Sequence, residues 1–302
     1  MKIAIAGGSG FVGTALIDAL LKEEHDLYIL TRNPEKYTQT KNLHYIKWLN
    51  KDAVPEKNLK GLDIFINLAG ESLNSGRWTK NRKRRIVESR IETTKEMNRI
   101  LGTLEQKISL VINASAIGYY GTSEQGTFTE DNETTAKDFL SRTVQLWEKE
   151  ARKARAFSHR VVFTRFGLIL GQTQGALPTI VLPYKLFAGG TIGNGSQILS
   201  WIHIQDVAGA ILFCIHHSEI SGPVNFTAPQ QVTMREFGHS ISKTINRPHW
   251  FPVPAFVLKV VLGEMSILVL EGQKVHPQVL EKSHYPFRYA TLNVALNDLL
   301  KK

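Results

Sequence analysis

The sequence predicts an α/β fold in which a doubly wound parallel sheet is joined to a smaller C-terminal lobe. Short apolar runs alternate with helical stretches over the first 170 residues, and glycine and proline interrupt this pattern after residue 171. Apolar runs of about five residues between helical stretches are typical of parallel strands covered on both faces. We place the boundary near residue 228, which gives a sheet domain of residues 1–228 and a lobe of residues 229–302 on the substrate side.

The first strand and helix enclose the most informative motif of the chain. An apolar run at residues 2–6 is followed by glycines spaced three apart, and an amphipathic helix begins directly afterwards. Gly7 permits the tight turn, Gly10 lets the backbone approach a pyrophosphate, and Gly13 lets the helix pack close to the strand. The positive amino end of the helix is then directed at the anion. This order of strand, glycine turn and helix indicates a Rossmann-like dinucleotide site.

The other elements of the sheet domain follow from the same alternation. Strands are expected at 27–31, 64–69, 110–115, 161–165 and 224–226. Helices are expected at 11–24, 80–104, 138–156 and 206–217. The first helical turn places Phe11 and Val12 at the anion site beside the glycines.

The composition limits the class of protein. Apolar residues make up 42% of the chain and charged residues 21%, as in ordinary globular domains. Cys214 is the one cysteine, so no intramolecular disulfide can form and a reducing compartment is expected. The apolar start breaks on glycine too early for a signal peptide, and no apolar run approaches the roughly 18 residues of a membrane span. We therefore expect a cytoplasmic protein with no membrane partner.

The formal charge of +10 favours anionic partners. The basic run from Lys80 to Arg85 raises the question of nucleic acid, but neither an aromatic stacking platform nor a nucleic-acid-binding motif accompanies it. We interpret the run as a solvated helix face and predict no nucleic-acid partner. A phosphorylated cofactor or an anionic substrate would account for part of the charge.

The end of the second predicted strand bears on the choice of nicotinamide cofactor. Dinucleotide folds that prefer NAD usually place Asp or Glu there, to bind the ribose 2′-hydroxyl. This chain has Thr31 and Arg32 instead, while Asp26 precedes the strand at the wrong end of the sheet. A guanidinium at this position pairs with a 2′-phosphate and favours NADP(H). The alternative is an arginine that is simply solvated.

Further positions point to the same cofactor. Leu68 and Ala69 end a central strand, where small residues let the backbone lie against the adenosine and ribose. Arg90 lies near the centre of the apolar arc of its helix, and a charge on a buried face needs an anionic partner. That partner is an internal carboxylate or the cofactor phosphate, of which we favour the phosphate. Glu71 is either a general base or, more often at the start of a loop, a hydrated carboxylate.

The sequence does not indicate a metal site. His216 and His217 are adjacent and diverge by about 100° on a helix, and no His-Glu-x-x-His or Cys/His cluster exists. We expect a structural role for His203 at a strand end, and Asp206 as the N-cap of the following helix.

A series of short motifs runs nearly from end to end in an order that a known superfamily shares. The segments are Gly7–Gly13, 30–32, 69–71, 76–78, 89–94, 118–121, 138–140, 147–148, 189–190, 200–204, 222–225, 271–273 and 287–289. They resemble the extended short-chain dehydrogenase/reductase superfamily of nucleotide-sugar epimerases and dehydratases. Within it the chain is similar to the "epimerase family" branch, or YfcH-like group, with a C-terminal lobe of the DUF1731 type. The resemblance implies NADP(H) binding through Gly7, Gly10, Gly13, Thr31, Arg32, Leu68, Ala69 and Arg90, with Ile169 near the nicotinamide end.

The catalytic pattern of the superfamily is incomplete in this chain. Typical members carry Ser or Thr after the fourth strand and Tyr-x-x-x-Lys about 25 residues later, where the tyrosine transfers the proton and the lysine lowers its pKa. Ser115 supplies a hydroxyl, but residues 139–144 contain neither tyrosine nor lysine. The one Tyr-x-x-x-Lys, at residues 37–41, lies in a predicted loop and is interpreted as coincidence. We predict Ser115 and Tyr119 as the catalytic-site groups that face a substrate.

The neighbouring aromatic and acidic residues are expected to be structural: Tyr120 and Trp147 pack, and Glu130 caps the following loop. Residues 183–195, Trp201 and 287–289 are expected to close the substrate cleft. The leading hypothesis is an NADP(H)-dependent oxidoreductase or epimerase-like enzyme for a small carbonyl or sugar-like compound. The alternative is a catalytically silent NADP(H)-binding protein with a regulatory role, because the tyrosine–lysine pair is missing. The superfamily often dimerises through the helices at 80–104 and 138–156, so a homodimer is a further expectation.

Overall fold

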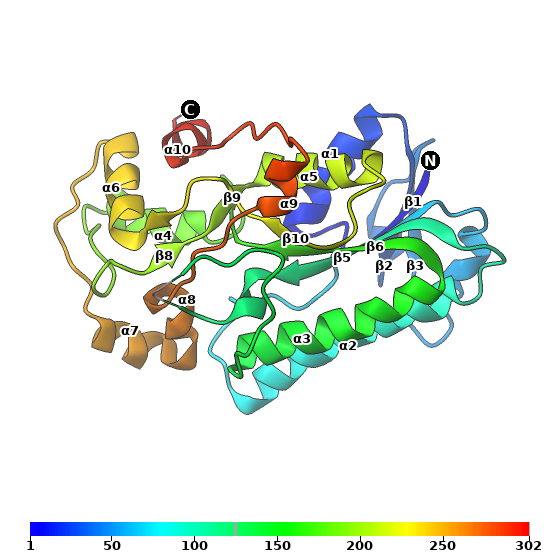
Figure 1. The fold of residues 1–302 in the computed structure, drawn as a ribbon, viewed down its shortest axis with the longest axis horizontal. Helices are drawn as coiled ribbons and strands as arrows, with labels where there is room; N and C mark the ends of the chain where they lie inside the picture. The colour runs from blue at the N-terminus through cyan, green and yellow to red at the C-terminus, as the bar shows by residue number, and fades with distance from the viewer. Residues whose placement is uncertain (124–125, 302) are drawn as a thin grey trace.

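A seven-stranded parallel sheet organises the chain in the computed structural model, which describes residues 1–123 and 126–301 (Figure 1). Its order is β10-β6-β5-β4-β1-β2-β3. The strands are β1 (Lys2–Ala6), β2 (Asp26–Thr31), β3 (Leu43–Lys47), β4 (Ile64–Asn67), β5 (Ile108–Ala116), β6 (Ser158–Phe166) and β10 (Gly222–Phe226). The chain reverses its direction of winding between β3 and β4, on either side of β1, so the predicted doubly wound fold is confirmed.

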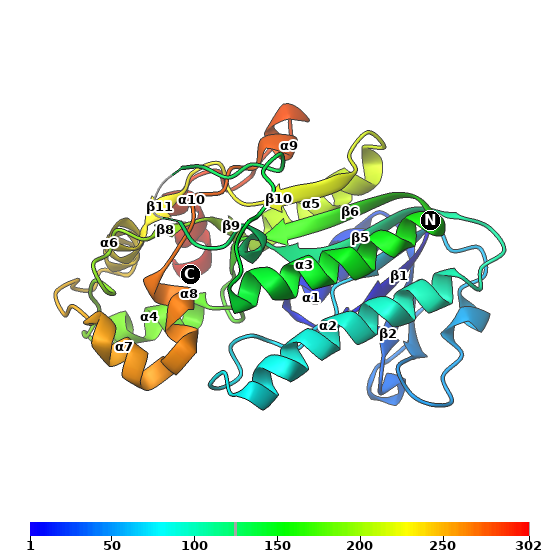
Figure 2. The ribbon, with the colours of Figure 1, turned by 60° about the horizontal axis from the view of Figure 1, so that its bottom comes forward.

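Two pairs of helices cover the two faces of the sheet (Figures 1 and 2). Helices α1 (Phe11–Lys22) and α5 (Ile204–His216) pack together on one face, and α2 (Lys80–Leu101) and α3 (Phe139–Ala151) pack together on the other. β1 shows why both faces are apolar. Its alternate residues enter different cores, Ile3 and Ile5 toward α1 and α5, Ala4 and Ala6 toward α2.

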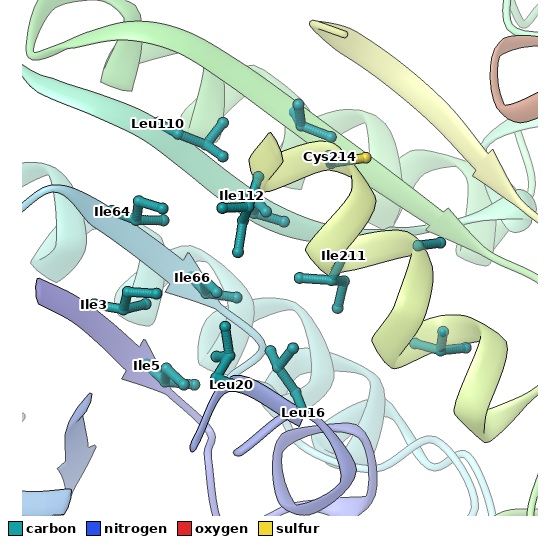
Figure 3. Close-up of a cluster of buried hydrophobic side chains, with 14 of the residues drawn as sticks. Ile3, Ile5, Leu16, Leu20, Ile64, Ile66, Leu110, Ile112, Ile211 and Cys214 are labelled. Carbon is teal, nitrogen blue, oxygen red and sulfur yellow. The ribbon is translucent and has the colours of Figure 1, made fainter. Parts of the chain in front are cut away.

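The core under α1 and α5 is shown in Figure 3. Leu16 and Leu20 of α1 and Ile211 of α5 meet the isoleucines of β1 and β4, and all three are fully buried. Cys214 lies in the same cluster, and burial raises the pKa of its thiol to about 12. The one cysteine is therefore an unreactive core residue.

Most of the remaining elements build the smaller lobe. They are β7 (Leu168–Leu170), α4 (Leu177–Lys185), β8 (Ile198–Leu199), β9 (Trp201–His203), β11 (Val232–Thr233), α6 (Met234–Ile245), α7 (Ala255–Leu262), α8 (Ile267–Leu270) and α10 (Leu292–Leu300). Helix α9 (Gln278–Lys282) packs instead on β10, and its Leu280 joins the core under α1 and α5. Single 3-10 turns occur at Pro34–Lys36, Pro55–Asn58, Ile117–Tyr120, Arg152–Ala156 and Gly263–Ser266. The core of this lobe joins Val181 of α4 and Trp201 of β9 to Phe237 of α6 and Leu296 of α10. The lobe thus includes segments from both sides of residue 228, and the division at that residue stays a prediction.

One expectation about a helix end is wrong. Asp206 is not an N-cap, because α5 begins at Ile204 and the Nδ1 atom of His203 accepts the capping hydrogen bond from the Gln205 amide at 3.1 Å. The buried Asp206 carboxylate instead accepts from the amides of Arg288 and Tyr289, each at 2.9 Å, and so holds the segment before α10. Burial raises the pKa of this carboxyl.

The basic run at the start of α2 is also less uniform than predicted. Arg84 and Arg85 are exposed as expected, but Arg82 is 6% exposed. Its guanidinium is turned inward and pairs with Glu71. The helix begins at Lys80, with the Thr79 hydroxyl accepting from the Arg82 amide at 3.1 Å.

Two kinds of feature are absent from residues 1–123 and 126–301. No helix there combines the length and apolar character needed to cross a bilayer. No cluster of three or more His, Cys, Asp or Glu side chains in those residues could hold a metal ion.

Candidate functional site

The glycine turn after β1 has the geometry that its spacing predicts. Gly7 has φ +80°, and a Cβ atom there would lie 2.8 Å from the backbone of Leu68 and Ala69. A Cβ atom on Gly13 would lie 2.5 Å from the Gly7 carbonyl oxygen, so helix α1 packs directly on the turn. A Cβ atom on Gly10 would meet one atom within 4 Å, the Gly7 carbonyl oxygen at 3.2 Å. Gly10 thus borders open space.

The strand ends next to this turn are fixed by the sheet register. Ala6 pairs with Leu30, which puts Thr31 level with Gly7, and the Leu68 amide donates to the Ala6 carbonyl oxygen at 2.8 Å. Arg32 is exposed and forms no hydrogen bond or ion pair with the described part of the chain. The carboxyl ends of the parallel strands thus bring the predicted cofactor residues to one edge of the sheet.

A cavity of about 860 Å³ opens at this edge and extends to the smaller lobe. The predicted site residues that line it are Gly7, Gly10, Phe11, Val12, Gly13, Leu68, Ala69, Arg90 and Ser115. Four others do not line it: Thr31, Arg32, Tyr119 and Ile169. Ile169 lies in β7 opposite Ile202, while the two residues before it, Gly167 and Leu168, do face the cavity.

Arg90 reaches the cavity from the sheet-facing side of α2, as its position on the apolar arc predicts. Its Nη1 atom donates to the carbonyl oxygens of Glu71 at 3.1 Å and Ile86 at 2.9 Å, and its guanidinium lies 5.1 Å from the centre of the Trp147 ring. No carboxylate among residues 1–123 and 126–301 forms an ion pair with it. Burial lowers the pKa of Arg90 to about 10, and the nearby Glu71 carboxylate opposes part of this shift. The side chain thus presents its positive charge to the cavity without a direct ion pair.

Glu71 is neither a free base nor simply hydrated. Its carboxylate forms an ion pair with Arg82, and Arg85 lies 3.6 Å away. Arg82 also donates to the Ser72 carbonyl oxygen. The loop after β4 is therefore held to the first turn of α2.

Ser115 belongs to a buried hydrogen-bonded network below the cavity. Its hydroxyl donates to Glu148 Oε1 at 2.7 Å. Arg165 of β6 binds the same carboxylate in bidentate fashion, with Nε–Oε1 at 2.8 Å and Nη2–Oε2 at 3.0 Å. Glu148 and Arg165 are 0% and 2% exposed. Because the Ser115 proton is directed at Glu148, the hydroxyl oxygen has only its lone pairs to offer elsewhere.

Tyr119 lies beside this network, outside the cavity lining. The Arg165 guanidinium carbon is 3.5 Å from the centre of the Tyr119 ring. Tyr120 is buried, as predicted for a packing residue, and its hydroxyl donates to Asn225 Oδ1 at 2.8 Å. Burial raises the pKa of the Tyr120 phenol to about 12. This arrangement favours a supporting role for Tyr119, and its catalytic role stays a prediction.

The helix that carries the tyrosine–lysine pair in typical members is α3. Its cavity face is mainly apolar, and its one hydroxyl there, on Thr143, donates to the Phe139 carbonyl oxygen of the same helix at 2.7 Å. Leu140 and Val144, four residues apart on the helix, line the cavity together with Trp147. Trp147 is 5% exposed and its indole Nε1 donates to the Thr94 hydroxyl at 3.0 Å. This confirms its packing role, although its ring also faces the cavity.

The far wall of the cavity comes from the segment between α7 and α9, which the sequence analysis did not assign to the site. Met265, Leu268 and Val269 line it, as do Glu271 and Gln273. Residues 183–195, Trp201 and 287–289, which were expected to close the cleft, do not line this cavity. Trp201 is 0% exposed, so the expectation for it is wrong.

Three long-range contacts, which we call the clasp, attach this wall to the sheet domain. Arg77 Nε donates to the Val261 carbonyl oxygen at 2.9 Å, and Arg77 Nη2 donates to the Val260 carbonyl oxygen at 2.6 Å. Lys83 forms an ion pair with Glu264 at 2.6 Å. The clasp joins the start of α2 to the end of α7.

Glu130 joins two neighbouring elements, β10 and α9. Its Oε1 atom accepts from the amides of Asn225 at 2.9 Å and Val279 at 3.2 Å. The carboxyl is buried, which raises its pKa. It ties β10 to α9 rather than capping its own loop, so that expectation is wrong.

Comparison with known proteins identifies the family. Residues 3–226 match the NAD dependent epimerase/dehydratase family, and residues 253–299 match a domain of unknown function, DUF1731. The chain belongs to the NAD dependent epimerase/dehydratase family. The predicted resemblance is therefore confirmed, including the type of C-terminal lobe.

Relatives within the family match over the full length. The epimerase family protein YfhF of Bacillus subtilis is 47% identical over 300 residues, covering 99% of this chain and 98% of the relative. An epimerase family protein of Staphylococcus haemolyticus is 40% identical over 299 residues, covering 99% of both.

Among solved structures, the human epimerase family protein SDR39U1, crystallised with NADPH, is 29% identical with a TM-score of 0.85 and covers 99% of both chains. A nucleoside-diphosphate sugar epimerase of Corynebacterium glutamicum is 28% identical with a TM-score of 0.78. That match covers 99% of this chain and 58% of the other.

Proposed function

We propose that this protein binds NADP(H) in the cavity at the carboxyl edge of the sheet and acts as an oxidoreductase or epimerase-like enzyme. The observation that carries the proposal is the combination of an open glycine turn with a buried cationic side chain that forms no direct ion pair in the described chain. Gly10 is the N-cap residue of helix α1 and has no side chain to cap the helix, and the first turn of α1 contains no acidic residue. Arg90 supplies the positive charge on the same cavity.

The residues present fit a dinucleotide. The amide groups at the amino end of α1 are suited to phosphate oxygens, because no side chain of the helix occupies them. The missing side chain of Gly10 leaves room for close approach. When bound, a nicotinamide dinucleotide supplies hydride transfer.

NADP(H) is proposed over NAD(H) because of the end of β2. Arg32 is exposed and has no protein partner in the described chain, while neither Thr31 nor Arg32 is an acid that could bind a 2′-hydroxyl. The crystal structure of human SDR39U1 with NADPH, at 29% identity, supports the same choice.

The chain's own groups suggest how a substrate would be held. Ser115 faces the cavity as an acceptor, because the Glu148–Arg165 pair fixes the direction of its proton. Leu140 and Val144 make the adjacent surface apolar and exclude water. These two residues also favour the second candidate, a catalytically silent NADP(H)-binding regulator, because no phenol or ammonium occupies their positions.

Titration of the purified protein with NADPH and NADH tests the cofactor assignment. We expect tighter binding of NADPH, and a loss of that preference of about tenfold or more in Arg32→Glu, because a carboxylate would repel the 2′-phosphate. Arg84→Glu, an exposed arginine on α2 outside the cavity, is the matched control and should bind like the parent. Equal affinity of the parent for both nucleotides contradicts the assignment.

Turnover separates the two candidates. A small carbonyl or sugar-like compound that changes the rate of NADPH oxidation supports the enzyme. Tight NADPH binding with no turnover, and a protein partner recovered in one redox state of the nucleotide, supports the regulator. A homodimer, a cytoplasmic location and the absence of nucleic-acid and membrane partners stay predictions.

A further inference from the structure

The part of the cavity that lies beyond the glycine turn has a lining unlike that of an anion site. Given that NADP(H) occupies the turn, as proposed above, we propose that this part, which we call the far chamber, takes an uncharged and largely apolar ligand rather than a nucleotide sugar. The far chamber is bounded by α3, α4, α6 and the segment of residues 262–273.

Aliphatic side chains from several elements converge on the far chamber. They include Leu140 of α3, Ile180 of α4, Met234 of α6, and Met265, Leu268 and Val269 of the far wall. Helix α8 has no buried residue, and Ile180, Leu268 and Val269 are only half-buried. A ligand with an apolar body would remove this surface from water, which is the main source of affinity in such pockets.

The charges around the cavity argue against a diphosphate in the far chamber. Among the lining residues Arg90 is the one cation, and it lies on the glycine-turn side, where the proposed cofactor needs it. Asp138 and Glu271 line the cavity as carboxylates, the first capping α3 and the second accepting from the Thr122 hydroxyl at 2.6 Å. A diphosphate would meet acidic groups without a second cation, so its transfer from water would be opposed.

The remaining polar groups of the far chamber are neutral and mostly engaged. Gln273 Nε2 donates to the Ile117 carbonyl oxygen at 3.2 Å, and the Ser200 hydroxyl donates to the Gln273 carbonyl oxygen at 2.9 Å. Ser115 keeps lone pairs for a donor. The lining therefore matches a ligand with an apolar body and one or two neutral polar groups, such as a hydroxyl.

Displacement of a neutral dye tests this assignment. N-phenyl-1-naphthylamine is titrated into the NADP⁺-loaded protein, in which no hydride donor is present, and is then displaced with 2-hexanone, 2-octanone and 2-decanone, or with UDP-glucose. We expect displacement to strengthen about fourfold for each added methylene, because each buries further apolar surface. UDP-glucose should not displace the dye at concentrations where 2-decanone does.

Charged substitutions locate the binding. Ile180→Glu and Leu268→Glu place a carboxylate in the far chamber and should weaken 2-decanone binding about tenfold or more, with NADP⁺ affinity unchanged. Leu146→Glu and Phe256→Glu are the controls, because these side chains are 50% and 69% exposed and lie outside the cavity lining. They should leave both affinities unchanged.

Three results would overturn the assignment: displacement by UDP-glucose as effective as that by 2-decanone, affinity that does not depend on chain length, or dye binding lost in Phe256→Glu but kept in Ile180→Glu. Failure of the parent to bind NADP⁺ is a separate result and overturns the proposed cofactor. The dye titration without nucleotide then still reports on the far chamber.

Discussion

Replacing Arg90 by methionine should stabilise the protein without nucleotide and weaken its binding of NADP⁺. Methionine keeps most of the aliphatic stem but removes the charge. Burial lowers the pKa of Arg90 from its ordinary value to about 10. Because the pKa of Arg90 is lower in the folded than in the unfolded protein, folding disfavours the charged guanidinium at every pH below these two pKa values. At neutral pH a shift of this size corresponds to a loss of about 3 kcal/mol in folding stability.

The hydrogen bonds of Arg90 offset part of this cost. Its guanidinium donates to two carbonyl oxygens, at 3.1 and 2.9 Å, and such bonds contribute about 1 kcal/mol each. The net expectation is an apoprotein that is more stable by about 1 kcal/mol. A phosphate paired with the guanidinium contributes about 1.5–3 kcal/mol, so NADP⁺ should bind about tenfold to a hundredfold more weakly.

Urea denaturation without nucleotide and calorimetric titration with NADP⁺ measure the two effects separately. Arg99→Met is the control, because Arg99 lies on the same helix but pairs with Glu56 and Glu96 on the surface. This control should leave NADP⁺ binding unchanged and lower the free energy of unfolding by less than about 1 kcal/mol. If Arg90→Met bound NADP⁺ like the parent, or lost more than about 2 kcal/mol of stability, the role given to this charge would be refuted.

Three other predictions test the framework around the site. Glu148→Gln should lower the free energy of unfolding, measured by urea denaturation, by about 3–5 kcal/mol because it leaves Arg165 buried and unpaired. Arg152, the other partner of Glu148, is 46% exposed, so Arg152→Gln should lower it by less than about 1 kcal/mol. Similar losses in the two variants would contradict the buried network. Gly13→Ala should lower the midpoint of thermal unfolding, since the new Cβ atom would lie 2.5 Å from the Gly7 carbonyl oxygen. Gly10→Ala, whose Cβ atom would lie 3.2 Å from that oxygen, should fold but lose nucleotide affinity. The reverse order of thermal midpoints would disprove this division of roles. Burial lowers the pKa of His203 to about 4, and Asp298 opposes part of this shift. Because the neutral imidazole is favoured by folding, the contribution of His203 to stability is present above pH 6.5 and is lost as the pH falls toward 4. In His203→Asn the urea midpoint should therefore change less with pH between 6.5 and 4, and an unchanged dependence on pH would exclude His203 as the titrating group.

The features that the sequence predicted well are local. The glycine turn, its strand and its helix lie within 22 residues, so spacing alone gives their geometry. Arg90 was found because helical periodicity places it among apolar neighbours. β3 was missed because it is an edge strand in which only Ile46 is buried, and it therefore shows no apolar run.

The features that were not predicted depend on contacts between distant segments. The Glu148–Arg165 pair joins α3 to β6, and each residue alone resembles an ordinary surface charge. Arg82 was assigned to a solvated face because nothing in the basic run shows that Glu71 turns toward it. The far wall at residues 262–273 contains Gly263 near its start, and its apolar residues do not show from the sequence alone whether they enter a core or border a cavity.

The clasp has a consequence for how ligands enter. Its bonds run from Arg77 to α7, a helix that buries none of its residues, and from Lys83 to Glu264 in the 3-10 turn that follows. Surface contacts of this kind are individually weak, so we expect α7 to separate from the sheet domain without exposing a core. Residues 269–273 stay attached through Gln197, Thr122 and Ser200. Admission to the enclosed space would then cost little energy, and the rate of exchange with solvent would depend on ionic strength through Lys83 and Glu264.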